Sequence, residues 1–252
     1  MALLLFDFAR FMIFPIMNEK SLGIKTREVI GQAFYRSVPV MAGYIVLGIG
    51  FGILLRNAGF GVIWAFAMSA LIYAGSMQYV GIGLLTGGAS VVTTIITTIM
   101  VNARHLFYSI SMIDKYKGAG KFKPYMIFAL TDETYSLLCE DRGPSAETLN
   151  LYRFFVSLFN QCYWVTGSVL GSLLGSILPF STEGIEFSMT ALFIASFTEQ
   201  WISSKEHVPA LTGLASTVLC LLVFGPQKFL IPSMLLITFV LSIIRKREVA
   251  KA

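Results

Sequence analysis

Long apolar runs separated by short polar stretches alternate along the whole chain. Eight runs are candidates for membrane-crossing helices, because a helix needs about 20 mostly apolar residues to span the hydrocarbon core of a bilayer. The residue-by-residue alternation typical of barrel strands is absent from these runs. The pattern predicts an all-α, polytopic membrane protein with about seven to eight hydrophobic segments. The eight candidates are 37–55, 60–86, 88–113, 124–139, 152–179, 187–203, 208–224 and 229–244.

The composition supports this class. Of the 252 residues, 56% are hydrophobic and 13% are charged, whereas an average soluble domain has about 25% charged residues. A soluble fold of this length would leave too much of that apolar surface in water. The loops between the runs are too short to fold alone, and no GxxxxGK[ST] phosphate-binding motif occurs. We therefore expect one membrane domain that neither hydrolyses ATP nor binds a cofactor.

The formal net charge of +5 comes from basic residues that gather beside the apolar runs. Such clusters mark the cytoplasmic flanks of membrane-crossing helices, so they indicate orientation in the lipid bilayer and not a nucleic-acid surface. The chain is therefore expected to cross the membrane several times. Twelve of the 19 basic residues form three clusters: Lys20, Lys25, Arg27 and Arg36; Lys115, Lys117, Lys121 and Lys123; and Arg245, Lys246, Arg247 and Lys251.

The N-terminal stretch 1–16 is apolar but short, and Asp7, Arg10 and Pro15 interrupt it. No small-residue cleavage pattern of a secretory signal follows it. Two interpretations are open: a helix lying in the membrane interface, or an extension that precedes a true start at Met17. In either case, residues 17–252 are expected to form a single membrane transporter domain.

An internal repeat is visible in two pairs of segments that follow in the same order. MSALIYAGSMQY (68–79) is similar to MTALFIASFTEQ (189–200), and VLGIGFGILL (46–55) is similar to VLGSLLGSIL (169–178). We expect two halves, about 30–115 and 150–245, linked by 124–139. Both halves contain polar or helix-breaking residues within apolar runs, and helices broken at matching positions are typical of transporters.

The topology has two interpretations. If all eight runs cross the bilayer, the lysine-rich loop 114–123 lies outside, against the positive-inside rule. If one segment of each half is re-entrant, the loop lies inside and the two repeats have opposite orientations. We favour the second, an inverted repeat with broken helices.

Polar residues within the runs are the candidates for function. A charged side chain at a helix centre costs about 2.5–3.5 kcal/mol on insertion scales, so Arg104 needs a partner. Asp132 and Glu133 can provide one, but neighbours on a helix point about 100° apart, so one acid would pair with Arg104 while the other faces a cavity. The alternative is a buried pair that only fixes how the helices pack.

The remaining polar positions divide into candidates for function and for structure. His105 either carries a proton or caps a backbone group, and Gln78 and Glu199 stand at matched places in the repeat. The GxxxG pairs within 46–55 and 169–178 indicate close helix packing. The three cysteines (Cys139, Cys162 and Cys220) have no metal-ligand spacing and are expected to be small core residues, so no metal site is predicted.

Three motifs carry a family resemblance: AGSMQY (74–79), VNARHLFYSISM (101–112) and LTDETYSLL (130–138). Their order and spacing resemble the signature segments of the AzlC family, the large subunits of two-component branched-chain amino acid exporters. The similarity covers roughly residues 30–245. It implies an inner-membrane permease that works with a short membrane partner of the AzlD type. The residues within the matching motifs are Gln78, Asn102, Arg104, His105, Asp132 and Glu133.

The functional hypothesis is a secondary transporter that exports Val, Leu, Ile, Met or similar small apolar amino acids. Arg104, or N–H groups at a helix break, would hold the substrate carboxylate, and Asp132 or Glu133 would hold the ammonium group. The predicted substrate-binding residues are Gln78, Asn102, Arg104, Asp132 and Glu133, and the proton-coupling candidates are His105, Glu133 and Glu199. Two alternatives are an accessory membrane subunit without a path of its own and an intramembrane hydrolase, which lacks a clear nucleophile. No catalytic residue is predicted.

Overall fold

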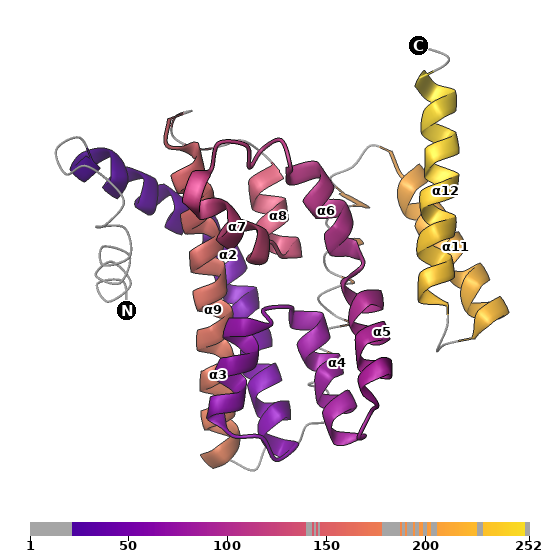
Figure 1. Ribbon diagram of the computed structural model, residues 1–252, viewed down its shortest axis with the longest axis horizontal. Helices are drawn as coiled ribbons and strands as arrows, with labels where there is room; N and C mark the ends of the chain where they lie inside the picture. Colours follow the sequence, from indigo (N-terminus) through magenta and orange to yellow (C-terminus); the bar gives the residue numbers. More distant parts are fainter. Residues whose placement is uncertain are drawn as a thin grey trace. The chain divides into compact units, whose positions relative to one another are not determined.

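The computed structural model describes residues 22–139, 143, 145, 147–177, 187, 190, 194, 197, 198, 201, 202, 206–225 and 229–249. All regular elements in these ranges are helical, which confirms the all-α class (Figure 1). The N-terminal extension, the Met17 start and most of the run 187–203 lie outside them. The elements are α2 (Leu22–Asn57), α3 (Val62–Leu71), α4 (Gly75–Thr86), α5 (Val91–Asn102), α6 (Arg104–Met112), the 3₁₀ helix η1 (Gly120–Phe122), α7 (Lys123–Phe128), α8 (Asp132–Cys139), α9 (Leu149–Ile177), α11 (Val208–Phe224) and α12 (Leu230–Val249).

The chain divides into two compact units, which are described separately. The first contains Met1–Thr86 and Ala103–Ser181, and therefore α2 to α4 and α6 to α9. The second contains Gly87–Asn102 and Thr182–Ala252, and therefore α5, α11 and α12.

A seam of glycines joins α2 to α9 in the first unit. A Cβ added to Gly48 would lie 2.9 Å from the Ser168 backbone nitrogen, and one added to Gly167 would lie 2.8 Å from the Ile45 carbonyl oxygen. Gly171 likewise packs against the backbone of Ile49. At these contacts the residue numbers of both helices increase in the same direction, so α2 and α9 are parallel. The seam confirms that the GxxxG pairs mark close helix packing.

The predicted apolar run 60–86 is two helices, because α3 and α4 form a hairpin. The Gln78 amide nitrogen in α4 donates to Ser69 Oγ in α3 over 3.2 Å, whereas residues nine apart in a continuous helix are about 13.5 Å apart along the axis. The chain reverses after α3, where Tyr73 has a positive φ of 46°. Such a conformation ends a helix of L-residues.

The predicted span 124–139 is also two helices, α7 and α8, with a turn between them. The ring of Phe122, just before α7, lies 4.7 Å from the ring of Phe154. Within α7, Tyr125 donates a 2.7 Å hydrogen bond to the side chain of Gln161. Residue numbers increase together here, so α7 runs parallel to α9.

The return helix α8 runs the other way. Its Thr134 accepts a 3.0 Å hydrogen bond from Asn160, near the middle of α9. Its last residues, by contrast, accept hydrogen bonds from Lys115, whose own carbonyl accepts from Arg153 near the start of α9. The run 88–113 is likewise divided, into α5 and α6 at Ala103.

The two hairpins meet beside the middle of α9. The Gln161 side chain contacts both, because its amide nitrogen donates to the Ala70 carbonyl at 3.0 Å while its oxygen accepts from Tyr125. The hairpins also approach from opposite ends of α9. The α3–α4 hairpin follows the C-terminal end of α2, where Ile53 packs on Gly175, and α7 begins near Phe154 (Figure 1).

One of the two similar pairs of segments lies in the described residues, and its two helices do not have the opposite orientations of an inverted repeat. Stretches 46–55 and 169–177 lie in the parallel helices α2 and α9, whereas an inverted repeat makes equivalent helices run in opposite directions. Instead, the opposite orientations belong to the two hairpins. The second pair cannot be compared, because most of 189–200 lies outside the described residues.

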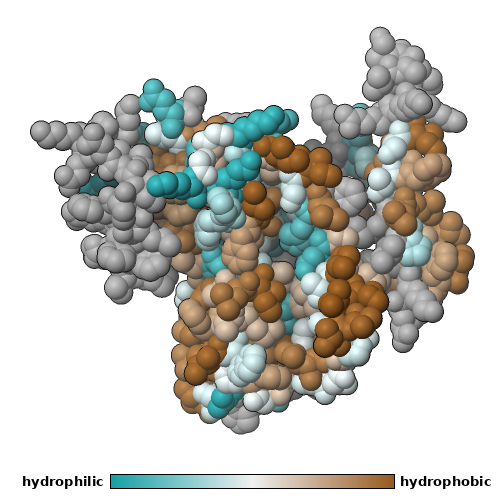
Figure 2. Space-filling view, viewed as in Figure 1, coloured by the Kyte–Doolittle hydropathy of each residue, from teal (hydrophilic) through white to brown (hydrophobic). Residues whose placement is uncertain are grey.

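The start of α2 and the lysine-rich loop 114–123 lie at the same end of the first unit. Phe34 packs edge-on against Phe159 with 5.7 Å between ring centroids, and Arg153 donates to the Lys115 carbonyl. Figure 2 shows hydrophilic residues gathered around this end and more hydrophobic surface over α3 and α4. These two segments therefore lie at one end of the unit, and the side of the membrane that this end faces stays a prediction.

Large apolar side chains cover much of the surface. Ile63 and Leu71 of α3 are 82% and 75% exposed, and α5 has no buried residue. Surfaces of this kind are stable against lipid and not against water. By length and hydropathy, one helix within the described residues, Thr26–Asn57, is sufficient to cross a bilayer alone, and Val62–Leu71, Val91–Asn102, Val208–Phe224 and Leu235–Ile244 are shorter apolar helices.

Candidate functional site

Three helices of the first unit begin at one cluster. Arg104 is the first residue of α6, Ser76 lies in the first turn of α4, and Asp132 is the first residue of α8. The Arg104 guanidinium forms an ion pair of 2.6 Å with Asp132 Oδ2 and donates to Ser76 Oγ at 2.5 Å. One cation therefore joins the beginning of α6 to the return helices of both hairpins. We call Ser76, Arg104 and Asp132 the arginine cluster.

The arginine cluster is only partly buried. The side chains of Arg104 and Asp132 are 28% and 30% exposed, so a ligand can reach them. Helix N-termini carry partial positive charge from unpaired N–H groups, and α4, α6 and α8 all present this end. The charge and the N–H groups together suit a carboxylate.

Asp132 and Glu133 diverge as their helical spacing predicts. Asp132 pairs with Arg104, whereas Glu133 turns toward α2, where Tyr44 donates to its Oε2 over 2.6 Å when the carboxylate is ionised. The pairing of Arg104 with one acid is therefore confirmed. The second acid meets a hydroxyl rather than an open cavity.

The hydrogen bonds around Tyr44 extend to α9. The Tyr44 hydroxyl is also 2.6 Å from Thr131 Oγ1, and Thr131 donates to Thr134 Oγ1 over 3.0 Å. Thr134 in turn accepts from the Asn160 amide nitrogen. We call Tyr44, Thr131, Glu133, Thr134 and Asn160 the hydroxyl chain.

Gln78 occupies a separate buried network. Its side chain is 0% exposed, accepts a 2.8 Å hydrogen bond from the Trp164 indole and donates to Ser69. The amide thus ties both arms of the α3–α4 hairpin to α9. The structure assigns Gln78 a bracing contact, and its predicted contact with substrate stays a prediction.

The other predicted residues are placed as follows. His105 lies next to Arg104 in α6, with its ring centroid 5.9 Å from that of Tyr108. Asn102 is the last residue of α5, in the second unit. Glu199 lies outside the described residues.

Sequence reasoning missed Ser76, Tyr44 and Asn160. Ser76 is within the AGSMQY motif, so the motif itself was a signal for it. Tyr44 and Asn160 are single neutral polar residues in the long helices α2 and α9, and such residues occur often in membrane helices without a functional role. Cys139 was expected in the core but is exposed at the end of α8.

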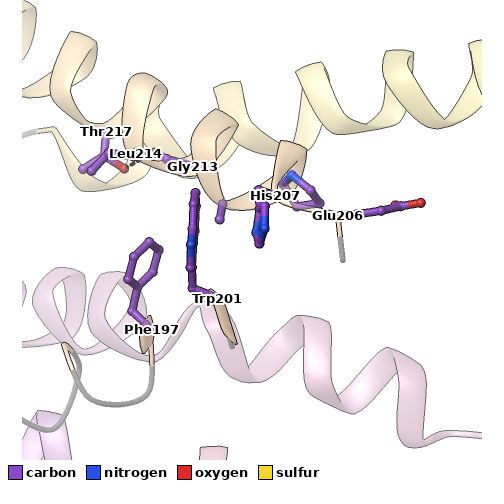
Figure 3. A pocket seen from close by; sticks show the side chains of 9 residues that line it. Phe197, Trp201, Glu206, His207, Gly213, Leu214 and Thr217 are labelled. Carbon is purple, nitrogen blue, oxygen red and sulfur yellow. Dashed lines mark hydrogen bonds between the residues drawn. The ribbon is translucent and has the colours of Figure 1, made fainter. Parts of the chain in front are cut away.

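A cavity of about 500 Å³ lies in the second unit, beside the start of α11 (Figure 3). Its wall includes an aromatic stack in which the Trp201 ring lies 4.1 Å from His207 and 5.9 Å from Phe197. The other lining residues are Glu206, Pro209, Ala210, Gly213, Leu214 and Thr217. The wall is mostly apolar, with one imidazole and one carboxyl side chain at its edge.

The comparison with protein families gives a match over residues 39–178, to the family described as "AzlC protein". The chain belongs to the AzlC family. The match runs from the middle of α2 to the end of α9, and it includes each residue of the arginine cluster and of the hydroxyl chain.

Relatives match over most of the chain. The "Branched-chain amino acid transport protein AzlC" of Bacillus subtilis is 46% identical over 215 residues, which cover 85% of this chain and 85% of that protein. An "Uncharacterized membrane protein" of Haemophilus influenzae is 41% identical, covering 85% and 88%, and one of Helicobacter pylori strain J99 is 40% identical, covering 86% and 95%. No solved structure matches. This AzlC-family chain is therefore a membrane protein.

Proposed function

We propose that the protein is the permease subunit of a secondary transporter that exports branched-chain or similar small apolar amino acids across the inner membrane. The observation that carries the proposal is the arginine cluster, in which Arg104 joins the beginnings of α4, α6 and α8. Broken helices whose N-termini face a central site are the common way in which transporters bind substrate carboxylates. The relative from Bacillus subtilis, named a branched-chain amino acid transport protein, supports the substrate class.

Substrate binding in this proposal uses charges already present. The substrate carboxylate is held by Arg104 and by N–H groups at the start of α4 or α8, and the ammonium group by Asp132. Each substrate charge then has a partner, which is necessary because an unpaired charge in a low-dielectric site is costly. Asn102 and Gln78 remain candidates for substrate contact.

Selectivity among substrates is expected to be weak. An apolar pocket distinguishes side chains that differ by one methylene by only about 1–3 kcal/mol. Val, Leu, Ile and Met are therefore all expected to be carried, while Lys is excluded because a second charge would lack a partner. A small membrane subunit of the AzlD type completes the proposed transporter.

The proposal is tested by amino acid efflux from cells. Cells are loaded with Val, Leu, Ile, Met, Ala or Lys by dipeptide feeding, and efflux is compared for this chain alone, for the candidate small subunit alone and for both. The expected result is faster efflux of Val, Leu, Ile and Met when both are present.

The controls separate the proposed permease from an accessory subunit. If the Arg104→Ala variant inserts normally and pairs with the small subunit but efflux is unchanged, the path lies elsewhere and this chain is accessory. No increase for any of the six amino acids in the presence of both subunits would overturn the substrate class.

A further inference from the structure

The hydroxyl chain forms a buried line of hydrogen bonds that the proposed substrate contacts do not use. Its hydroxyl side chains come from α2, from the turn before α8 and from α8. Tyr44 is 5% exposed, Thr131 is 8% exposed and Thr134 is 0% exposed. Three contacts connect four oxygens from Glu133 to Thr134, at 2.6, 2.6 and 3.0 Å. Oxygens this close inside a protein require a proton between each pair.

The number of protons in this line depends on Glu133. Thr131 has one hydroxyl proton and donates it to Thr134. The two contacts of Tyr44, to Thr131 and to Glu133, then have the single proton of Tyr44 between them. Because one hydroxyl donates one hydrogen bond, the second contact lacks a proton if Glu133 is ionised.

A protonated Glu133 completes the line. Glu133 then donates to Tyr44, Tyr44 donates to Thr131, and Thr131 donates to Thr134, so each of the three contacts holds one proton. An ionised Glu133 accepts from Tyr44 instead. Thr131 must then turn to donate to Tyr44. Its contact with Thr134 either loses its proton or receives one from the Thr134 hydroxyl.

We propose that Glu133 carries a proton in this conformation and that the hydroxyl chain transmits the loss of this proton to the first turn of α8. Thr131 precedes α8 and accepts the backbone N–H of Thr134 at 3.3 Å, which is the position of a helix N-cap. A turn of its side chain therefore acts on the residues that begin the helix, including Asp132. The proton thus controls the carboxylate that holds Arg104.

The titratable and charged groups around Glu133 are consistent with a neutral carboxyl. They come from each neighbouring segment: Tyr44 on α2, Tyr73 in the α3–α4 turn, Arg104 and Tyr108 on α6, and Asp132 beside it. The one cation among them, Arg104, makes its ion pair with Asp132. A single proton added to Glu133 therefore leaves the arginine and the aspartate balanced. The proton comes from water and returns to water, and no other bond is made or broken.

This inference deepens the proposed function by naming the group that couples a proton to the substrate site, but its first test does not depend on transport. Infrared difference spectra of the purified full-length protein in lipid detect the carbonyl stretch of a protonated carboxylic acid. The expected spectrum contains such a band at neutral pH, which disappears in Glu133→Gln and on raising the pH. A spectrum in which Glu133→Gln removes no carboxylic acid band at neutral pH overturns the proposal.

The second test identifies the role of Thr131. In Thr131→Val, Tyr44 loses Thr131 as an acceptor and donates more readily to an ionised Glu133, which moves the loss of the infrared band to lower pH. Thr131→Ser keeps the hydroxyl and restores the wild-type midpoint. The control is Ser37→Ala, which removes another buried hydroxyl, one bonded to Tyr163 at 3.0 Å, and leaves the midpoint unchanged.

The infrared midpoints are then compared with the pH profile of amino acid flux in liposomes containing the candidate small subunit. A shift of both profiles in Thr131→Val, absent in Thr131→Ser, supports coupling. Equal midpoints in Thr131→Val and wild type would contradict transmission through this residue. If the band behaves as expected but no amino acid is transported by any variant, the proton site stands and the proposed substrate is wrong.

Discussion

Arg104 has both a counter-charge and a neutral acceptor within the membrane protein. Asp132 supplies the charge at 2.6 Å and Ser76 the acceptor at 2.5 Å. Hydrogen bonds to charged groups contribute about 1.5–3 kcal/mol each. The pair is about 30% exposed, so its contribution to folding is smaller than that of a fully buried pair. Its main effect is therefore expected in ligand binding rather than in stability.

We predict that Arg104→Ala and Asp132→Asn each reduce substrate affinity about tenfold or more, because 1.4 kcal/mol corresponds to a factor of ten. Radioactive leucine binding to the purified protein measures the effect. Arg104→Lys keeps the charge but loses the forked geometry, so we expect an intermediate value. Lys117→Ala removes the exposed pair with Asp114, whose side chains are 72% and 83% exposed, and serves as the neutral control. Wild-type affinity in all three cluster variants would refute the site assignment.

The arginine pair could be predicted from sequence because both members are costly in hydrocarbon, so each requires the other. The partner acid could not be chosen, since either carboxylate of the LTDE motif satisfies the charge. Tyr44 and Asn160 could not be found at all. A neutral polar side chain costs little in a long helix, and its role depends on which segments fold against it.

At the scale of elements, the α2–α9 seam depends on the absence of side chains. A Cβ at Gly171 would overlap the backbone of Ile49, and neither group can move without separating the helices. Overpacking of this kind typically costs about 1–3 kcal/mol.

We predict that Gly171→Ala lowers the thermal midpoint of the detergent-solubilised protein by several degrees. Gly31→Ala is the matched control, because Gly31 is also within a helix but has nothing within 4 Å of its Cβ position. That change is expected to be neutral or to stabilise by about 0.5–1 kcal/mol, since alanine is the better helix former. A smaller loss for Gly171→Ala than for Gly31→Ala would show that the seam is not close-packed.

The hydrophobic pattern identified the apolar segments and predicted broken helices, but not where the chain reverses direction within a segment. The predicted run 208–224 matches α11 residue for residue, because Pro209 and Gly225 mark its ends. The turns in the runs 60–86 and 124–139 have weaker markers, Gly75 after the first turn and the N-cap Thr131 after the second, and neither specifies that the chain reverses direction. A turn inside a membrane segment is stable only when neighbouring protein groups satisfy its backbone. Gln161, which accomplishes this for Ala70, lies 91 residues away.

At the scale of the whole molecule, most of the basic residues described in the first unit lie at one end, although Arg56 lies in the last turn of α2 at the other. The start of α2, the loop 114–123 and the start of α9 share the basic end, while Asn57 ends α2 at the other. The positive-inside rule assigns the basic end to the cytoplasm.

We predict that single cysteines at Lys117 and Ser145 react with an impermeant thiol reagent only from the cytoplasmic side, and one at Asn57 only from outside. The background protein has Cys139, Cys162 and Cys220 replaced, since Cys139 is exposed. Mass-shift labelling of intact cells and of inverted vesicles gives the side for each position. Labelling of Lys117→Cys and Asn57→Cys from the same side would contradict the arrangement of α2 across the bilayer.

The glycine seam also determines which parts of this protein can move. Two backbones in direct contact have no layer of side chains that could rearrange between them. We therefore expect α2 and α9 to move as one rigid pair. Each hairpin packs on α9 through side chains instead: α7 through the ring of Phe154 and the amide of Gln161, and α4 through Trp164. An opening toward one side of the membrane is therefore expected to move a hairpin relative to the fixed pair of α2 and α9. Gln161 is hydrogen-bonded to both hairpins, so the motion of either one changes its contacts.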